Sequence, residues 1–134
     1  MSNKLVVVAA VLVLGFTAGT AQTEPPVPSV GWIADDLNLP LRYGTAVEFA
    51  FQYEVHLVGG EDPEGDATLT LELCENHRCT TSTLAPAEGI RFLRYGLDPS
   101  QYHRGRNLYT FTLTLTDNGI TSDDTLTIQA VVRP

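Results

Sequence analysis

The stretch that decides the fold is AVEFAFQYEVHLV, residues 46–58. Its odd positions from 47 to 57 carry large apolar side chains, whereas the even positions from 48 to 56 are mostly polar or charged. A period of two is the pattern of a β-strand with one face against a core, and a helix does not produce it. Burying that apolar face would contribute on the order of 10 kcal/mol before chain entropy, at about 1.5–3 kcal/mol for each large side chain.

The same alternation recurs on the C-terminal side, where Thr-rich stretches lead into turn signals such as Asn118-Gly119. Residues 35–40 interrupt the first strand, and Asp98-Pro99 suits one helical turn with Asp98 as N-cap. The predicted strands cover residues of about 29–34, 46–58, 67–74, 79–84, 90–95, 108–117 and 124–132. This rhythm predicts an all-β fold, a seven-stranded antiparallel immunoglobulin-like β-sandwich.

The N-terminus precedes this domain. Lys4, an apolar run over residues 5–13 and small residues up to Ala21 predict a secretory signal peptide over 1–21. A retained membrane anchor is the alternative, but the run is shorter than the ~20 residues of a spanning helix. Residues 22–30 form a Pro-rich segment and 31–134 the β-sandwich domain. We therefore expect a secreted, extracellular or cell-envelope protein with no membrane span after signal cleavage.

The charge balance of the chain limits the classes of partner that it is expected to bind. After removal of the signal the basic side chains are seven Arg, against sixteen Asp and Glu, so the net charge is near −9. Such a surface disfavours nucleic acid and anionic membranes, which are polyanions, and favours cations and basic partners.

Two cysteines stand close together at Cys74 and Cys79. In an exported protein an isolated pair predicts a disulfide, here across a short hairpin loop. The alternative uses Cys74, His77 and Cys79 as metal ligands, which would give three ligands in an oxidising compartment.

The chain from Val47 onward resembles the bacterial cadherin-like and related immunoglobulin-like extracellular repeats. The resemblance rests on Asp62-Pro63-Glu64-Gly65-Asp66 before a Thr/Leu strand, and on the run Tyr109 to Gly119, which ends in Asp-Asn-Gly. Glu64 replaces the usual central Asp, the Cys74–Cys79 loop is not part of the common pattern, and one domain stands where such repeats come in tandem. The resemblance implies a cadherin-like fold and an adhesion role.

Acidic loops are expected to meet at one end of such a sandwich, bringing together residues of the 61–66 loop with Asp117, Asp123 and Asp124. Carboxylate oxygens at that density suit Ca²⁺. The resemblance singles out Asp62, Asp66 and Asp117 as ligands. The alternative is a set of solvated turns without a metal.

The other end is expected to gather basic and aromatic residues, of which the candidate binding residues are Arg78, Tyr102, His103, Arg104 and Arg106, with His77 beside them. One interpretation is head-to-tail self-association, in which acidic loops meet this cluster and form rings or filaments. A solvated loop is the alternative. A carbohydrate platform of Tyr102, Arg104, Tyr95 and Trp32 is a third interpretation, although Trp32 also suits the core.

The sequence holds no nucleophile elbow, no HExxH and no His-rich metal spacing. We therefore expect a non-enzymatic binding or adhesion module, dependent on calcium if the acidic loops bind it. Its partner would be a protein or glycan at the cell surface, or a second copy of the chain. A structural subunit of an extracellular assembly or filament is the alternative function.

Overall fold

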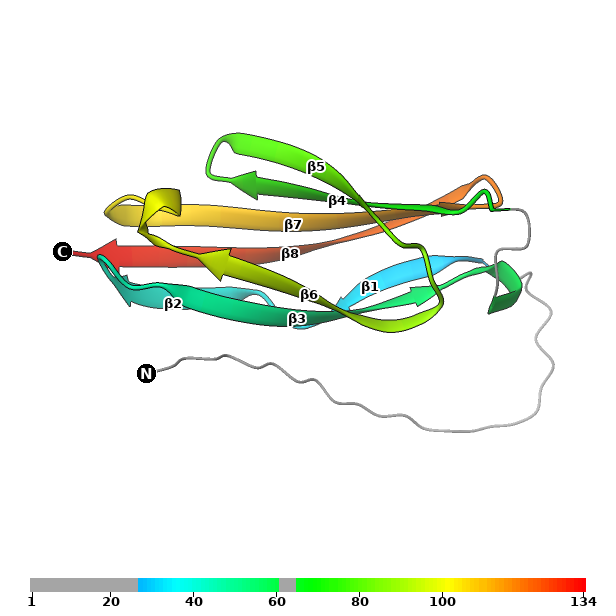
Figure 1. The fold of residues 1–134 in the computed structure, drawn as a ribbon, viewed down its shortest axis with the longest axis horizontal. Helices are drawn as coiled ribbons and strands as arrows, with labels where there is room; N and C mark the ends of the chain where they lie inside the picture. The colour runs from blue at the N-terminus through cyan, green and yellow to red at the C-terminus, as the bar shows by residue number, and fades with distance from the viewer. Residues whose placement is uncertain (1–26, 61–64) are drawn as a thin grey trace.

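A computed structural model describes residues 27–60 and 65–134, which form two packed β-sheets (Figure 1). The predicted signal peptide, Pro-rich residues 22–26 and Asp62 lie outside these residues. The smaller sheet has the order β1 (Ser29–Ile33), β3 (Val47–His56), β6 (Gly89–Leu97). The larger has the order β2 (Leu37–Arg42), β8 (Ile120–Arg133), β7 (Gly105–Asp117), β4 (Thr68–Glu75), β5 (Arg78–Leu84). Two short 3₁₀ segments, η1 (Val58–Gly60) and η2 (Pro99–Gln101), are the only helical turns in the described chain, and neither approaches the length of a membrane span.

The core lies where the two sheets face each other. Along β3 the odd positions are buried and the even positions are exposed or half-buried, as the alternation predicts. Phe111 of β7 is fully buried opposite them, and its ring contacts Phe51 at a centroid distance of 5.5 Å. Trp32 packs edge-on against the same two rings and donates its indole N–H to the Phe111 carbonyl at 3.1 Å. The prediction that Trp32 belongs to the core is therefore confirmed.

The fold class is confirmed as an all-β, immunoglobulin-like sandwich, but the strand count and pairing differ from the prediction. Residues 35–40, expected to interrupt a strand, lead into β2, which pairs in parallel with β8. This segment can form a strand despite Pro40 because β2 lies at the edge of its sheet. Pro40 has no N–H to donate, and an edge strand tolerates that loss. After β1 the chain thus crosses from the smaller sheet to the larger one. The described residues form eight strands, and β2–β8 is their one parallel pair.

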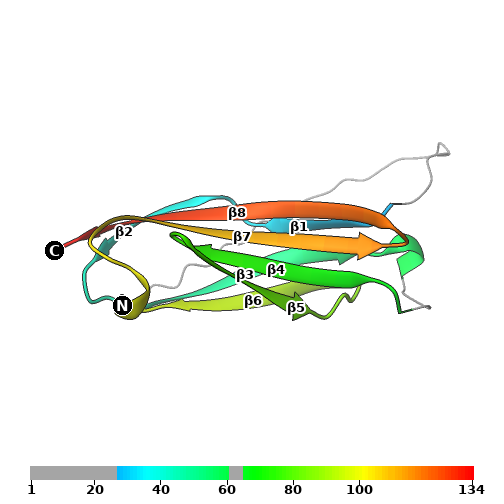
Figure 2. The ribbon, with the colours of Figure 1, turned by 90° about the horizontal axis from the view of Figure 1, so that it is seen from above.

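Apart from the β1–β2 crossover, the connections gather towards two ends, as expected for this topology (Figures 1 and 2). One end, which we call the acidic-loop end, holds the β3–β4 connection and the β7–β8 turn at Asn118-Gly119. The other holds the β2–β3 turn, the β4–β5 turn and the β6–β7 connection with η2. We call it the arginine-rich end, because five arginines lie there: Arg42, Arg78, Arg104, Arg106 and Arg133.

Candidate functional site

The arginine-rich end contains an open groove of about 570 Å³ between the β4–β5 turn and η2. Its walls come from segments far apart in the sequence, residues 75–78 and residues 100–103. The lining residues are Glu75, Asn76, His77, Arg78, Ser100, Gln101, Tyr102 and His103. Four of them (His77, Arg78, Tyr102 and His103) belong to the set that the sequence placed at this end.

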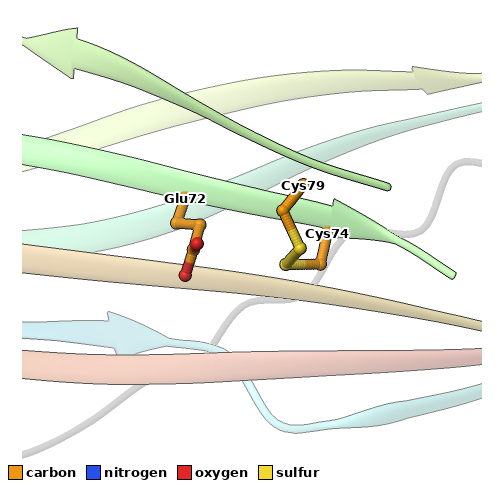
Figure 3. Close-up of side chains that lie close together, drawn as sticks. All are labelled: Glu72, Cys74 and Cys79. Atoms are coloured by element: carbon orange, nitrogen blue, oxygen red, sulfur yellow. A yellow bond between two sulfur atoms is a disulfide. The ribbon is translucent and has the colours of Figure 1, made fainter. Parts of the chain in front are cut away.

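The first wall is a two-residue turn closed by a disulfide. Cys74 and Cys79 lie opposite each other in the β4–β5 register and are bonded (Figure 3). The turn itself needs a left-handed residue, which Asn76 provides at φ 58°. The disulfide prediction is confirmed, and the Cys74–His77–Cys79 metal site is wrong because both sulfurs are consumed in the bond.

Glu72 lies beside the disulfide and completes a grouping with the two sulfurs (Figure 3). Over residues 27–60 and 65–134 it is the one grouping of three or more His, Cys, Asp or Glu side chains whose potential ligand atoms lie within 4.8 Å of one another. A metal binds the thiolate form of cysteine, and a disulfide offers none. Glu72 therefore gains no partner ligands from the two cysteines.

The second wall is η2, which is capped at its start. The Asp98 carboxylate accepts from the Ser100 N–H at 3.0 Å, and the Gln101 side chain accepts from the Asp98 N–H at 2.9 Å. Hydrogen bonds from the Ser100 side chain and backbone lower the pKa of Asp98. The predicted helical turn with Asp98 as N-cap and Pro99 in first position is confirmed.

Glu75 joins the two walls. Its carboxylate accepts from the Tyr95 hydroxyl at 2.6 Å and from the Gln101 amide at 3.0 Å. Burial and this carboxylate raise the pKa of Tyr95, so the phenol stays protonated and keeps donating. The acidic group in the groove lining is thus already occupied by neutral donors.

Asn107 ties both walls to β7 and is fully buried. Its amide oxygen accepts from the Asn76 side chain and from the His103 N–H, each at 3.0 Å. Its amide nitrogen donates to the His103 carbonyl at 2.7 Å and, over a longer 3.3 Å, to that of Gly105. Asn76 continues the network by accepting from the Leu108 N–H. One buried side chain therefore holds the turn and the η2 loop in fixed positions.

The arginines of this end form no close ion pair within the part of the chain that the structure describes. Among the described residues no Asp or Glu side chain lies within 4.0 Å of the guanidinium groups of the five arginines. Arg78 lines the groove, whereas Arg104 lies over the Tyr43 ring at 4.1 Å and Arg106 is exposed at the start of β7. Guanidinium groups in this state are donors for carboxylate or another oxyanion. Ligand binding by these residues stays a prediction.

The structure does not form the carbohydrate platform. Tyr102 is buried, and its hydroxyl donates to the Thr45 carbonyl at 2.7 Å and accepts from the Gly44 N–H at 2.9 Å. Trp32 and Tyr95 are both half-buried and packed against the core. Tyr102 therefore lines the groove as a structural residue that anchors the β2–β3 turn, and this interpretation of the aromatic residues is wrong.

At the acidic-loop end the carboxylate of Asp117 is engaged with the backbone. Asp117 is buried, and its Oδ2 accepts from the Val58 N–H at 2.8 Å. The tight turn lets β8 start at Ile120, so Asp124 lies within the strand and does not reach the loops. Its Oδ2 accepts from the Trp32 N–H at 2.8 Å. Asp66 is exposed at this end. The expected convergence of Asp123 and Asp124 on the loops is wrong, and calcium binding by Asp62, Asp66 and Asp117 stays a prediction.

Sequence reasoning missed the residues that build the groove: Glu75, Asn76, Gln101 and Asn107. Asn107 carried a signal, because it occupies an inward position of β7 in phase with Tyr109 and Phe111. A polar residue in such a position must find partners inside the protein. Nothing comparable marked Glu75 or Gln101.

Comparisons with known proteins identify no family for the chain. No protein-family profile matches the sequence. No curated protein matches it either. One similar solved structure is the CARDB domain of the PF1109 protein from Pyrococcus furiosus, solved in complex with di-metal ions, at 17% identity and a TM-score of 0.42. That match covers 84% of this chain and 100% of the other. A second is the PKD domain of human KIAA0319, at 12% identity and a TM-score of 0.36, covering 88% and 94%.

Proposed function

We propose that this protein is an exported, non-enzymatic binding module of the cell surface or extracellular space, and that the groove at its arginine-rich end takes an acidic segment of a partner protein. The observation that carries the proposal is the groove itself: it has rigid walls, Arg78 in its lining, and an acidic residue, Glu75, that is already hydrogen-bonded.

The disulfide supports the location. Disulfides persist in oxidising compartments and are rare in the cytosol, and Cys74–Cys79 closes the turn that forms one groove wall. The signal peptide predicted from the sequence also favours export. A binding role in the extracellular space is consistent with a wall that depends on an oxidised cysteine pair.

The groove chemistry supports an acidic peptide over a sugar. Sugar sites commonly present an exposed Trp, Tyr or Phe ring for stacking, but the one such residue in the groove lining, Tyr102, is buried and its hydroxyl is occupied. The groove instead offers the side chains of Arg78, His77 and His103, which donate to carboxylates when charged. The protein as a whole is acidic, with a net charge of −8. An acidic partner would therefore be repelled elsewhere and directed to this end.

Binding can be measured with a short glutamate-rich peptide by calorimetry at low and high salt. We expect binding at low salt, a loss at high salt, and a loss of about fivefold or more in affinity for Arg78→Ala, which removes a charge-assisted donor. Arg91→Ala on β6 removes the same charge outside the groove and is the matched control. Absence of peptide binding, or equal losses in the two variants, would contradict the proposal. Binding of a carboxylated polysaccharide without binding of the peptide would replace the peptide with a glycan partner.

A structural subunit of an extracellular filament is the second candidate, favoured by arginines without a close ion pair to a described residue at one end and an exposed acid, Asp66, at the other. Head-to-tail contacts between the two ends would be ionic, so assembly should grow with concentration and vanish in high salt. Sedimentation velocity at both salt concentrations tests this. A particle that keeps one size at low and high salt would exclude it.

Calcium dependence is a separate proposal about the acidic-loop end. Extracellular calcium modules bind at roughly 0.1–1 mM, so about 5 mM Ca²⁺ is expected to raise the melting temperature by mass action. Asp66→Asn is expected to remove that rise. An unchanged melting temperature at this concentration would end the calcium hypothesis.

A further inference from the structure

The sandwich has four edge strands, and they differ in how they are protected from pairing with another strand. The order of the sheets puts β1 and β6 at the edges of the smaller sheet, and β2 and β5 at the edges of the larger one. An unprotected edge presents a row of backbone N–H and C=O groups that a further strand can pair with.

Two edges are blocked by direct means. On β1 the N–H groups of Val30 and Trp32 donate to side chains of β8, to the Ser122 hydroxyl at 3.2 Å and the Asp124 carboxylate at 2.8 Å. On β2 the ladder is interrupted by Pro40, which has no N–H. Neither strand can accept a regular new neighbour along its length.

The third edge, β6, carries charges on both faces. Arg91 is the register partner of the buried Tyr53, which places it on the face between the sheets, and Arg94 lies on the opposite face. An inward-pointing charge is a recurrent device against edge pairing, because a new strand would bury it.

The fourth edge, β5, has none of these devices. From Cys79 to Leu84 it has no charge, no proline and no glycine, and its sequence is Cys-Thr-Thr-Ser-Thr-Leu. Every residue from Arg78 to Thr83 is exposed, so both faces of the strand extend beyond the smaller sheet. β5 pairs with β4 on one side and lies at the margin of the larger sheet (Figure 1). A further strand would therefore meet no steric barrier on either face.

We propose that β5 pairs antiparallel with β5 of a second copy of this chain, giving a closed two-fold dimer with one continuous sheet. A two-fold axis at Thr81 places Thr81 opposite the partner's Thr81, Thr80 opposite the partner's Ser82 and Arg78 opposite the partner's Leu84. No like charges face each other in this register. Like charges directly opposite each other would destabilise the pairing. The pairing and the groove share one residue, Arg78, at the start of β5; the rest of β5 does not line the groove.

The chain already contains the kind of side-chain pair that this register repeats. Between β7 and β8 the hydroxyls of Thr112 and Thr125 are hydrogen-bonded at 2.9 Å, and those of Thr116 and Thr121 at the same distance. Both pairs are direct register partners. Thr81 with its copy, and Thr80 with the partner's Ser82, reproduce this arrangement across the two-fold axis.

Sedimentation equilibrium of the purified protein tests the proposal, with Thr81→Lys as the disrupting variant. Lysine at 81 would face its own copy across the axis, so we expect the dimer to weaken at least about tenfold. Thr68→Lys is the matched control, since Thr68 is equally exposed on β4, an interior strand. We expect it to keep the wild-type dimer.

The salt response separates this interface from the filament discussed above. Because β5 carries no charge beyond Arg78, the wild-type dimer should persist in high salt and stop at two subunits. At about 1 mM protein, dimers with Kd values up to about 1 mM are detected. A strict monomer at that concentration would overturn the proposal. So would equal association of wild type and Thr81→Lys, or a dimer that only Thr68→Lys disrupts.

Discussion

Replacing Asn107 with alanine tests whether one buried side chain organises the groove. The amide makes four hydrogen bonds with no exposure to solvent, three of them between 2.7 and 3.0 Å. A buried hydrogen bond contributes about 1 kcal/mol net, and its loss leaves partners such as the Asn76 amide unpaired. We expect Asn107→Ala to lower the free energy of unfolding by about 3 kcal/mol.

That loss is large against the roughly 5–15 kcal/mol that stabilises a domain. At about 4 °C per kcal/mol for a domain of this size, the melting temperature should fall by about 12 °C. Thermal and urea unfolding followed by far-UV circular dichroism measures both quantities. Asn38→Ala provides the control, because Asn38 is exposed on β2 and should change stability by no more than about 0.5 kcal/mol. A loss below about 1 kcal/mol for Asn107→Ala would refute the role of this network.

Three further changes test other parts of the structure. Hydrogen bonds from the Leu57 N–H and, to a smaller extent, from His56 lower the pKa of Glu88 in the folded protein. The ionised Glu88 carboxylate therefore stabilises the fold at pH values above the pKa that Glu88 has in the unfolded chain. Glu88→Gln should cost under about 1 kcal/mol at pH 7 in urea titrations, and the difference should vanish as pH falls through the lowered pKa. Burial raises the pKa of Tyr109 to about 12, so wild type should lose stability as pH rises from about 10 to 12; Tyr109→Phe should flatten that part of an alkaline unfolding curve, and an unchanged slope would contradict the assignment. Replacing Cys74 and Cys79 together by serine should lower stability by about 2 kcal/mol in denaturant, because the bond closes only a short loop; a loss above about 4 kcal/mol would show that the bond does more than restrict the unfolded chain.

Alternation was sufficient to predict the strands that have one face in the core. β3 and β7 carry a strict period of two because successive side chains point to opposite faces. β2 also alternates, through Leu37, Leu39 and Leu41, but Pro40 led to the prediction of a break. Whether a strand lies at an edge, where proline is tolerated, is a property of the tertiary structure.

The groove could be predicted only in part for the same reason. The topology correctly brought His77, Arg78 and His103 to one end, because loops of alternate connections share an end of a sandwich. The roles of individual carboxylates depended on which backbone N–H came near them. Asp117 and Asp124 cap the Val58 and Trp32 amides, contacts that join positions 59 and 92 residues apart. No local pattern contains that information.

The parallel pairing of β2 with β8 has a mechanical consequence. Residues 37–42 run alongside residues 128–133 in the same direction, one strand near the beginning of the domain and the other at its end. Tension applied between the two termini would pull these neighbours along their length in opposite directions. All the hydrogen bonds between them would then share the load at once instead of opening one after another, so the join between β2 and β8 would resist stretching as a shear clamp.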